Sequence, residues 1–299
     1  MYDYTVEPLY VQKNKDLIAA DLYLPKKIKK PAVILMAHGF AALRQFGLIP
    51  FAQRFAQAGY AVVLFDYRCW GGSTGTPREL VSTKMQLEDW YSVIAYIIKH
   101  EAVDGHRVIL WGTGLSGGYV LQLASEFKGI RAVIAQVPFV DGAASSRQVP
   151  IQRMAQALKL ASQDIMASKV AGKVTTLPVV HPFALSFYLN AESYTGFMSL
   201  LNSDYYWSGE VPARAMLELV RFRPVNAVRN INIPVLFIAA LRDQVIPIEA
   251  SRETATNLAP FADYYEWDMT HFDIFHDKWL QQAVEIQLEF LSQQKGVSL

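Results

Sequence analysis

The chain has 299 residues, 52% of them hydrophobic, and its 28 basic and 27 acidic side chains give a formal net charge of +1. This composition excludes a disordered chain, and the balanced charge predicts neither a nucleic-acid partner nor an anionic membrane surface. A single cysteine, Cys69, excludes an internal disulfide framework.

The N-terminal stretch MYDYTVEPLY lacks the basic start and the apolar run of a secretory signal. Further along, no apolar run approaches the roughly 18 residues that span a bilayer. We therefore expect a cytoplasmic protein that acts on small molecules and has no membrane partner.

Short apolar runs alternate with helical patterns, which is typical of a mainly parallel sheet with helices on both faces. The opening segment alternates apolar and polar residues around QKNKD and predicts an antiparallel hairpin at the sheet edge. Strands are predicted at residues 17–25, 32–38, 61–67, 108–112, 132–138 and 235–241. The last five are apolar on both faces, as buried parallel strands are. The sequence therefore predicts an α/β fold.

This alternation stops after Pro138 and resumes at Pro234. We therefore predict an α/β core formed by residues 1–141 and 231–299, and a cap inserted at residues 142–230.

The predicted cap begins with a helical pattern that places Met154, Leu158, Ala161 and Ile165 on one face. Its later part is predicted to be loop-like and rich in aromatic residues. Such a cluster would close over an apolar site, although the same rings would serve equally well to pack the cap against the core.

The stretch VILWGTGLSGGYV, residues 108–120, satisfies two motif definitions. As G-x-G-x-x-G, starting at Gly112, it would place a dinucleotide pyrophosphate on a helix N-terminus. That reading needs a carboxylate about 20 residues further on, at the end of the next strand. The strand ends in Gln136 and Pro138 instead, so we predict no nucleotide cofactor.

Read as G-x-S-x-G, the stretch presents Ser116 on a turn from strand to helix. A serine hydroxyl needs a base that is oriented by a carboxylate, in the chain order Ser, Asp or Glu, His. Asp243 directly follows the apolar strand VLFIAAL and is the predicted carboxylate, with Asp141 as the alternative. His271 is the predicted base and is preferred to His276, because it comes first after the following strand.

The predicted oxyanion hole consists of two backbone N–H groups. One belongs to Gly117, which follows the serine, and the other to Phe40, with Ala41 as the alternative. No metal is implied. The predicted substrate pocket is lined by Leu115, Phe183, Phe187, Tyr188, Tyr206 and Trp207.

The stretches HGF, FDYRCWGGSTG, GTGLSGG, LRDQVIP and THFDIF occur in the order found in α/β-hydrolases, which the chain therefore resembles. Within that fold, GFAALRQFGLIPFAQRFAQAGYAVVLFDYR, QVPFVDG and VPARAMLELVRFRP resemble the X-Pro-peptidase-like hydrolases and fungal polyketide transferases. This resemblance implies a triad of Ser116, Asp243 and His271. Cys69 stands where relatives usually carry glycine, and HPFAL replaces a Pro-Gly-Glu-like stretch of the cap.

The sequence thus predicts a serine hydrolase that cleaves an ester or thioester with an apolar acyl group through an acyl-enzyme. Acyl transfer by the same triad and a catalytically silent ligand-binding protein are the alternatives. Peptidase activity is a weaker hypothesis, because the sequence locates no acidic cluster for a peptide N-terminus. The sequence leaves the oligomeric state open, a homodimer included.

Overall fold

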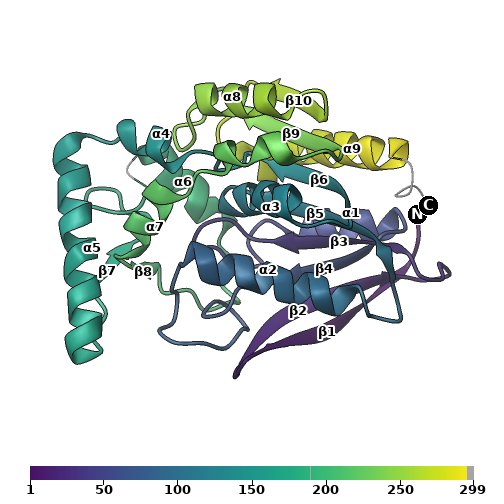
Figure 1. The fold of residues 1–299 in the computed structure, drawn as a ribbon, viewed down its shortest axis with the longest axis horizontal. Helices are drawn as coiled ribbons and strands as arrows, with labels where there is room; N and C mark the ends of the chain where they lie inside the picture. The colour runs from purple at the N-terminus through teal and green to yellow at the C-terminus, as the bar shows by residue number, and fades with distance from the viewer. Residues whose placement is uncertain (189, 295–299) are drawn as a thin grey trace.

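A twisted sheet forms the centre of the protein in the computed structural model, which describes residues 1–188 and 190–294 (Figure 1). Within the described residues this sheet has eight strands, in the order β1-β2-β4-β3-β5-β6-β9-β10. The strands are β1 (Tyr4–Lys13), β2 (Asp16–Pro25), β3 (Ala32–Ala37), β4 (Ala61–Phe65), β5 (Asp104–Thr113), β6 (Ile130–Gln136), β9 (Val235–Ala240) and β10 (Ala262–Trp267).

The strand directions agree with the hydrophobic patterns. β1 and β2 form an antiparallel hairpin at the sheet edge, and β2 also pairs antiparallel with β4. The remaining neighbours pair in parallel. Every residue of β3, β4 and β9 is buried, because helices cover both faces of the sheet there. The predicted α/β fold with a mainly parallel sheet and an edge hairpin is confirmed.

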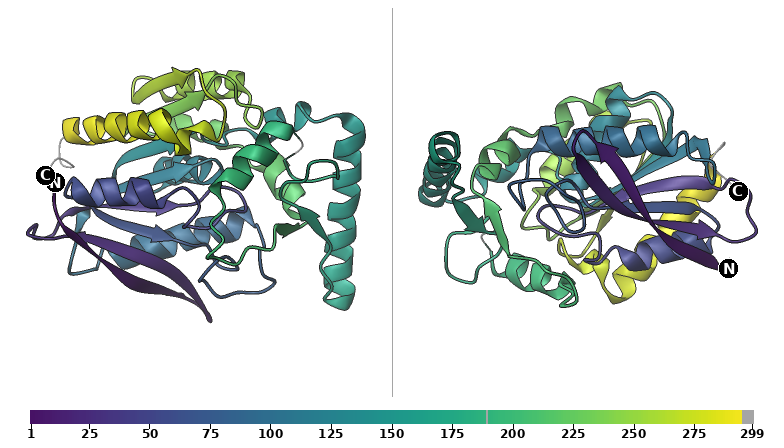
Figure 2. Two further views of the ribbon diagram at one scale, coloured as in Figure 1. Left: turned by 180° about the vertical axis from the view of Figure 1, so that it is seen from behind. Right: turned by 90° about the horizontal axis from the view of Figure 1, so that it is seen from below.

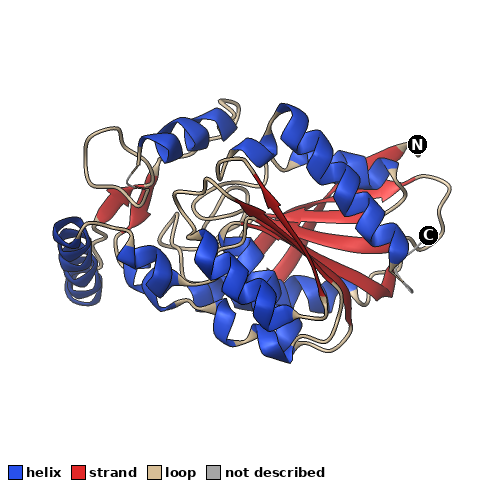
Figure 3. Cartoon of the chain, turned by 90° about the horizontal axis from the view of Figure 1, so that it is seen from above, coloured by secondary structure: helices blue, strands red, loops and turns tan. Residues whose placement is uncertain are grey.

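In the part of the chain that the structure describes, five helices cover the two faces of the sheet. Figure 1 shows one face, with α2 (Thr83–Ile97), α3 (Leu115–Glu126) and α8 (Ile248–Leu258) in front. The left view of Figure 2 shows the opposite face, covered by α1 (Ile49–Gln57) and α9 (Asp277–Gln293). Figure 3, seen from above, shows the strands enclosed between these helices.

Segment 142–230 lies between β6 and β9, and its described residues add no strand to the main sheet. Their long helix, α5, stands at one end of the molecule (Figure 1). The sequence predicted that the later part of this segment is loop-like, which is wrong: it contains two helices, α6 and α7, and a small antiparallel pair, β7 and β8. The elements are α4 (Gly142–Arg147), α5 (Ile151–Ala171), β7 (Thr176–Pro178), α6 (Ala191–Leu200), β8 (Glu210–Pro212), α7 (Ala215–Arg221), η1 (Pro224–Asn226) and η2 (Val228–Asn230).

Polar and apolar contacts both hold α5 to the rest of this segment. The buried carboxylate of Asp164 accepts hydrogen bonds from the side chain of Arg214, at the start of α7, and from the backbone N–H of Thr175. Beside this ion pair, Ala157 and Ala161 of α5 pack against Met216 of α7. Of the predicted face of α5, Ala161 is buried in this cluster and Met154 and Leu158 pack against it, whereas Ile165 is not part of it.

Among the described residues, the structure contains no helix that is both long and apolar enough to cross a membrane. The six parallel strands end at one edge of the sheet, because parallel strands share a direction. The loops that follow them meet at this edge, where ligands bind in open α/β sheets.

Candidate active site

The turn between β5 and α3 consists of one residue, Gly114. β5 ends at Thr113, α3 begins at Leu115, and Gly114 has φ 54° and ψ −122°. Residues with side chains are strained in this backbone region, which glycine reaches freely. A nucleophile elbow is a sharp, strained turn from strand to helix. The structure therefore places the elbow at Gly114, two residues before the serine that the sequence analysis selected.

Ser116 lies in the first turn of α3 and is fully buried. Its hydroxyl shares a short hydrogen bond with the phenol of Tyr67, which also accepts a 2.8 Å hydrogen bond from the indole N–H of Trp90. In the part of the chain that the structure describes, Ser116 neither bonds to His271 nor lines the pocket below. The structure therefore does not bring the predicted nucleophile to the predicted base. β5 ends at Thr113 and α3 begins at Leu115, so Ser116 falls in the first helical turn and is buried in the core.

The structure does bring Asp243 and His271 together. Nδ1 of His271 lies 2.7 Å from Oδ2 of Asp243, and the two side chains are only 6% and 3% exposed. Oδ1 of Asp243 accepts hydrogen bonds from the N–H groups of Val245 and Ile246, at 2.7 and 2.8 Å. The carboxylate is thus held by its own loop while it orients the imidazole.

The second ring nitrogen of His271 faces the elbow. A Cβ atom built on Gly114 would lie 3.7 Å from Nε2 of His271. When Nδ1 carries the proton donated to Asp243, Nε2 of the neutral ring is an acceptor. This nitrogen is therefore placed to take a proton from an oxygen beside Gly114.

The oxyanion-hole donor that follows the nucleophile was predicted to be the N–H of Gly117. The residue that follows the elbow in the structure is Leu115 instead. Among the described residues, the backbone N–H groups of Leu115 and Phe40 have no hydrogen-bond acceptor, and both residues line the pocket. Gly117 lies inside α3, where a Cβ atom would be 2.7 Å from Cβ of Pro138, and it does not line the pocket. The structure thus places Phe40 and Leu115, rather than Phe40 and Gly117, beside the elbow.

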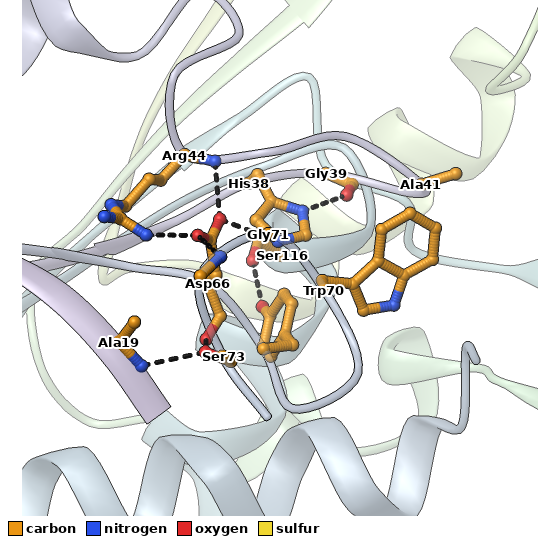
Figure 4. A network of polar contacts seen from close by, with 12 residues as sticks. Ala19, His38, Gly39, Ala41, Arg44, Asp66, Trp70, Gly71, Ser73 and Ser116 are labelled. Atoms are coloured by element: carbon orange, nitrogen blue, oxygen red, sulfur yellow. Dashed lines mark hydrogen bonds and ion pairs between the residues drawn. The ribbon is translucent and has the colours of Figure 1, made fainter. Parts of the chain in front are cut away.

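A buried polar network fixes the loop that carries Phe40 (Figure 4). Asp66, at the end of β4, accepts a 2.8 Å hydrogen bond from the N–H of Arg44 and pairs with its guanidinium. Arg44 also pairs with Asp21 of β2 at 2.8 Å. His38 contacts the carbonyl oxygen of Gly39 through Nδ1 at 2.9 Å, and burial lowers the pKa of His38. The loop is therefore tied to β2 and β4.

A pocket of about 310 Å³ lies over Gly114 and His271, between the sheet edge and residues 142–230. This volume is at the lower end of the range for small-molecule sites, and the lining is mainly apolar. The lining residues that come from the inserted segment are Gly142, Ser145, Ser146, Gln148, Val149, Pro150, Met154, Ala157, Phe187, Tyr188, Asn190, Met216, Leu219 and Val220.

Three of the six predicted pocket residues line this pocket: Leu115, Phe187 and Tyr188. Phe183 and Tyr206 are 88% and 87% exposed and lie outside it. Trp207 stacks on Phe197 at 5.2 Å and donates a hydrogen bond to the carbonyl oxygen of Ala41, so it packs loops together instead. The predicted pocket omits the α7 residues Met216, Leu219 and Val220, although they recur at three- and four-residue steps.

The alternative candidates have structural partners of their own. Asp141 caps α4 and pairs with Arg223 at 2.9 Å; burial would raise its pKa, but these hydrogen bonds lower the pKa overall. His276 bonds to Ser199 at 2.8 Å.

Cys69 has φ 73°, a backbone region that favours the glycine usual in relatives, and burial raises its pKa to about 11. Within the described ranges, no group of three or more His, Cys, Asp or Glu side chains could hold a metal ion.

Comparison with known proteins gives the family. The model of the family described as serine aminopeptidase, S33, matches residues 28–263. The quorum-quenching protein AidA of Acinetobacter baumannii is 34% identical over 95% of this chain and 94% of its own. Thiohydrolase aneE of Aspergillus aculeatus is 25% identical over 87% of this chain and 85% of its own.

A crystal structure of the α/β-hydrolase GrgF from Penicillium superposes with a TM-score of 0.83, covering 98% of this chain and 99% of that one at 20% identity. Penicillium grgF is named a polyketide transferase. The predicted resemblance is thus confirmed, and the chain belongs to the serine aminopeptidase S33 family of hydrolases, in an α/β-hydrolase group that includes fungal polyketide transferases.

Proposed function

We propose that this protein hydrolyses a carboxylic ester or thioester whose acyl group is apolar. The observation that carries the proposal is the Asp243–His271 pair, whose free ring nitrogen faces the elbow at the floor of a mainly apolar pocket. A buried, oriented imidazole at that place can act as general base and then as general acid.

The imidazole, the carboxylate, the two backbone N–H groups and the pocket wall each have a role in the proposed reaction. His271 takes a proton from the attacking oxygen and returns it to the leaving group. Asp243 holds the ring in the required tautomer and stabilises its charged form. The N–H groups of Phe40 and Leu115, which have no acceptor among the described residues, would stabilise the negative charge on the substrate oxygen. The apolar wall of the pocket would hold the acyl chain.

The names of relatives support this substrate class. A thiohydrolase among them fits a thioester substrate, and a polyketide transferase fits an apolar acyl group. In acyl transfer, an alcohol or amine would take the place of water in the same pocket.

A second candidate function is ligand binding without catalysis. It is favoured by one specific observation: the elbow carries glycine and therefore no hydroxyl. Turnover by the wild-type protein separates the two functions.

The test is a panel of esters and thioesters of graded acyl length, assayed with the wild type and with His271→Ala. We expect turnover by the wild type and a loss of about 10²–10⁴-fold in kcat/KM for the variant. His276→Ala is the matched control, because His276 bonds to Ser199 outside the pocket. Equal turnover by wild type and His271→Ala would contradict the proposal, and no turnover by the wild type would favour ligand binding.

A further inference from the structure

We infer that Gly114, and not Ser116, occupies the position of the nucleophile, so that a water molecule attacks the substrate directly and no acyl-enzyme forms. This inference rests on the proposed function and concerns its chemical step.

The backbone identifies the position. Gly114 is the single residue between β5 and α3, and its φ of 54° and ψ of −122° give the strained turn that an elbow requires. The residue at the apex of such a turn projects its side chain over the sheet edge, toward the base. A Cβ atom at Gly114 would be 3.7 Å from Nε2 of His271 and 3.8 Å from Cα of Gly39, which are ordinary contacts. There is room for a Cβ atom, and a serine oxygen bonded to it could reach hydrogen-bond distance of the imidazole, about 2.6–3.2 Å.

Ser116 does not meet the requirements of a nucleophile. It is fully buried in α3 and bonds to the phenol of Tyr67, while Gly114, Leu115 and His271 line the pocket. Burial raises the pKa of Tyr67, so its phenol stays protonated at neutral pH and cannot activate the serine as a base. The phenol also accepts a hydrogen bond from Trp90. The contact between Tyr67 and Ser116 is therefore part of a buried hydrogen-bonded group in the core.

Glycine leaves the elbow free for a water molecule at the place of the missing hydroxyl. In the proposed step, this water gives a proton to Nε2 of His271 while its oxygen bonds to the carbonyl carbon, and the carbonyl electron pair moves onto the carbonyl oxygen. The resulting oxyanion is held by the N–H groups of Phe40 and Leu115. When the carbonyl re-forms, the bond to the alcohol oxygen or thiol sulfur breaks, and His271 returns the proton to that atom. The products are a carboxylic acid and an alcohol or thiol.

Covalent labelling distinguishes this step from an acyl-enzyme. The wild type and Gly114→Ser are incubated with an alkyl fluorophosphonate, and the adducts are counted by intact-protein mass spectrometry and located by peptide mapping. We expect no adduct on the wild type, although it hydrolyses the ester panel, and one adduct on residue 114 of Gly114→Ser. This variant should also release its first alcohol product in a burst.

Gly172→Ser is the matched control. Gly172 ends α5 with φ 63°, close to the φ of Gly114, and a Cβ atom there would meet nothing within 4 Å. The control therefore carries the same substitution at another glycine of positive φ, although its ψ of 10° differs from the −122° of Gly114, and it should stay unlabelled.

The wild-type measurement keeps the inference falsifiable if Gly114→Ser does not fold. An adduct on Ser116 of the wild type, or an acyl group on Ser116 in acid-quenched turnover, overturns the inference and leaves the proposed hydrolysis in place. A wild type that hydrolyses no member of the panel overturns the proposed function and the water step together. Turnover by an unlabelled wild type supports both.

Discussion

Asp243 binds His271 through one carboxylate oxygen and its own loop through the other. Because both carboxylate oxygens are engaged, the side chain of Asp243 cannot rotate without losing hydrogen bonds. It is therefore a rigid support for the imidazole of His271.

Asp243→Asn is expected to lower kcat/KM by about 10³–10⁴-fold, because an amide N–H directed at Nδ1 favours the tautomer in which Nε2 is protonated and cannot accept a proton. The measurement is steady-state kinetics with the ester panel. Asp263→Asn, an exposed position on β10, is the control. A loss of less than about threefold at Asp243 would show that the pair does not orient the base.

Met216→Trp is expected to change the acyl-length preference of the enzyme. Met216 is buried and lines the pocket from α7, so a larger ring would shorten the space for the acyl chain. We expect the KM for long-chain esters to rise by about tenfold or more, which corresponds to about 1.4 kcal/mol, while short esters are little affected. Phe183→Ala is the control, because this side chain is exposed and lies outside the pocket. Equal effects of the two substitutions would place the substrate elsewhere.

Arg44→Met is expected to destabilise the protein by about 3–5 kcal/mol, because it leaves the fully buried carboxylate of Asp66 without its cationic partner. The comparison is Arg242→Met, which removes an exposed pair with Asp268 and should cost about 0–1 kcal/mol. Urea unfolding gives both values. If the two variants lose the same free energy, the buried pair is not what fixes the loop.

His38 gives the stability a dependence on pH. Burial holds its pKa below the ordinary value of 6.5, so the unfolded chain takes up a proton at this residue at a higher pH than the folded chain does. Stability from this group is therefore present above about pH 6.5 and falls as the pH drops toward the folded pKa. We expect the free energy of unfolding of His38→Asn to fall less steeply between pH 7 and 5 than that of the wild type. Parallel curves in urea titrations at each pH would exclude this contribution.

The sequence was sufficient to predict the sheet because its central strands are continuous apolar runs, which are buried on both faces. The pattern of α6 and α7 was harder to interpret, since aromatic residues in the inserted segment pack helices and loops alike. Phe197 of α6, for example, is buried against Trp207, whereas Phe183 and Tyr206 are exposed.

The hydrophobic pattern also bears on the site residues. Asp243 and His271 follow strands whose ends the hydrophobic pattern locates, and the structure brings them together. The elbow depends on which glycine takes a positive φ, and GTGLSGG offers several choices of register. β5 extends to Thr113, so the turn falls on Gly114, whereas an elbow at Ser116 would need the strand to continue to Leu115. The backbone conformation of a turn is set by the strand and helix on either side, which a short motif does not specify.

The left-handed backbone of Gly114 has an evolutionary consequence. Glycine and serine codons such as GGC and AGC differ by one base, and the shape that a serine would need at this place is already present in the main chain. A lineage with this fold can therefore exchange attack by water for attack by a side chain, or reverse the exchange, through one substitution and without rebuilding the site.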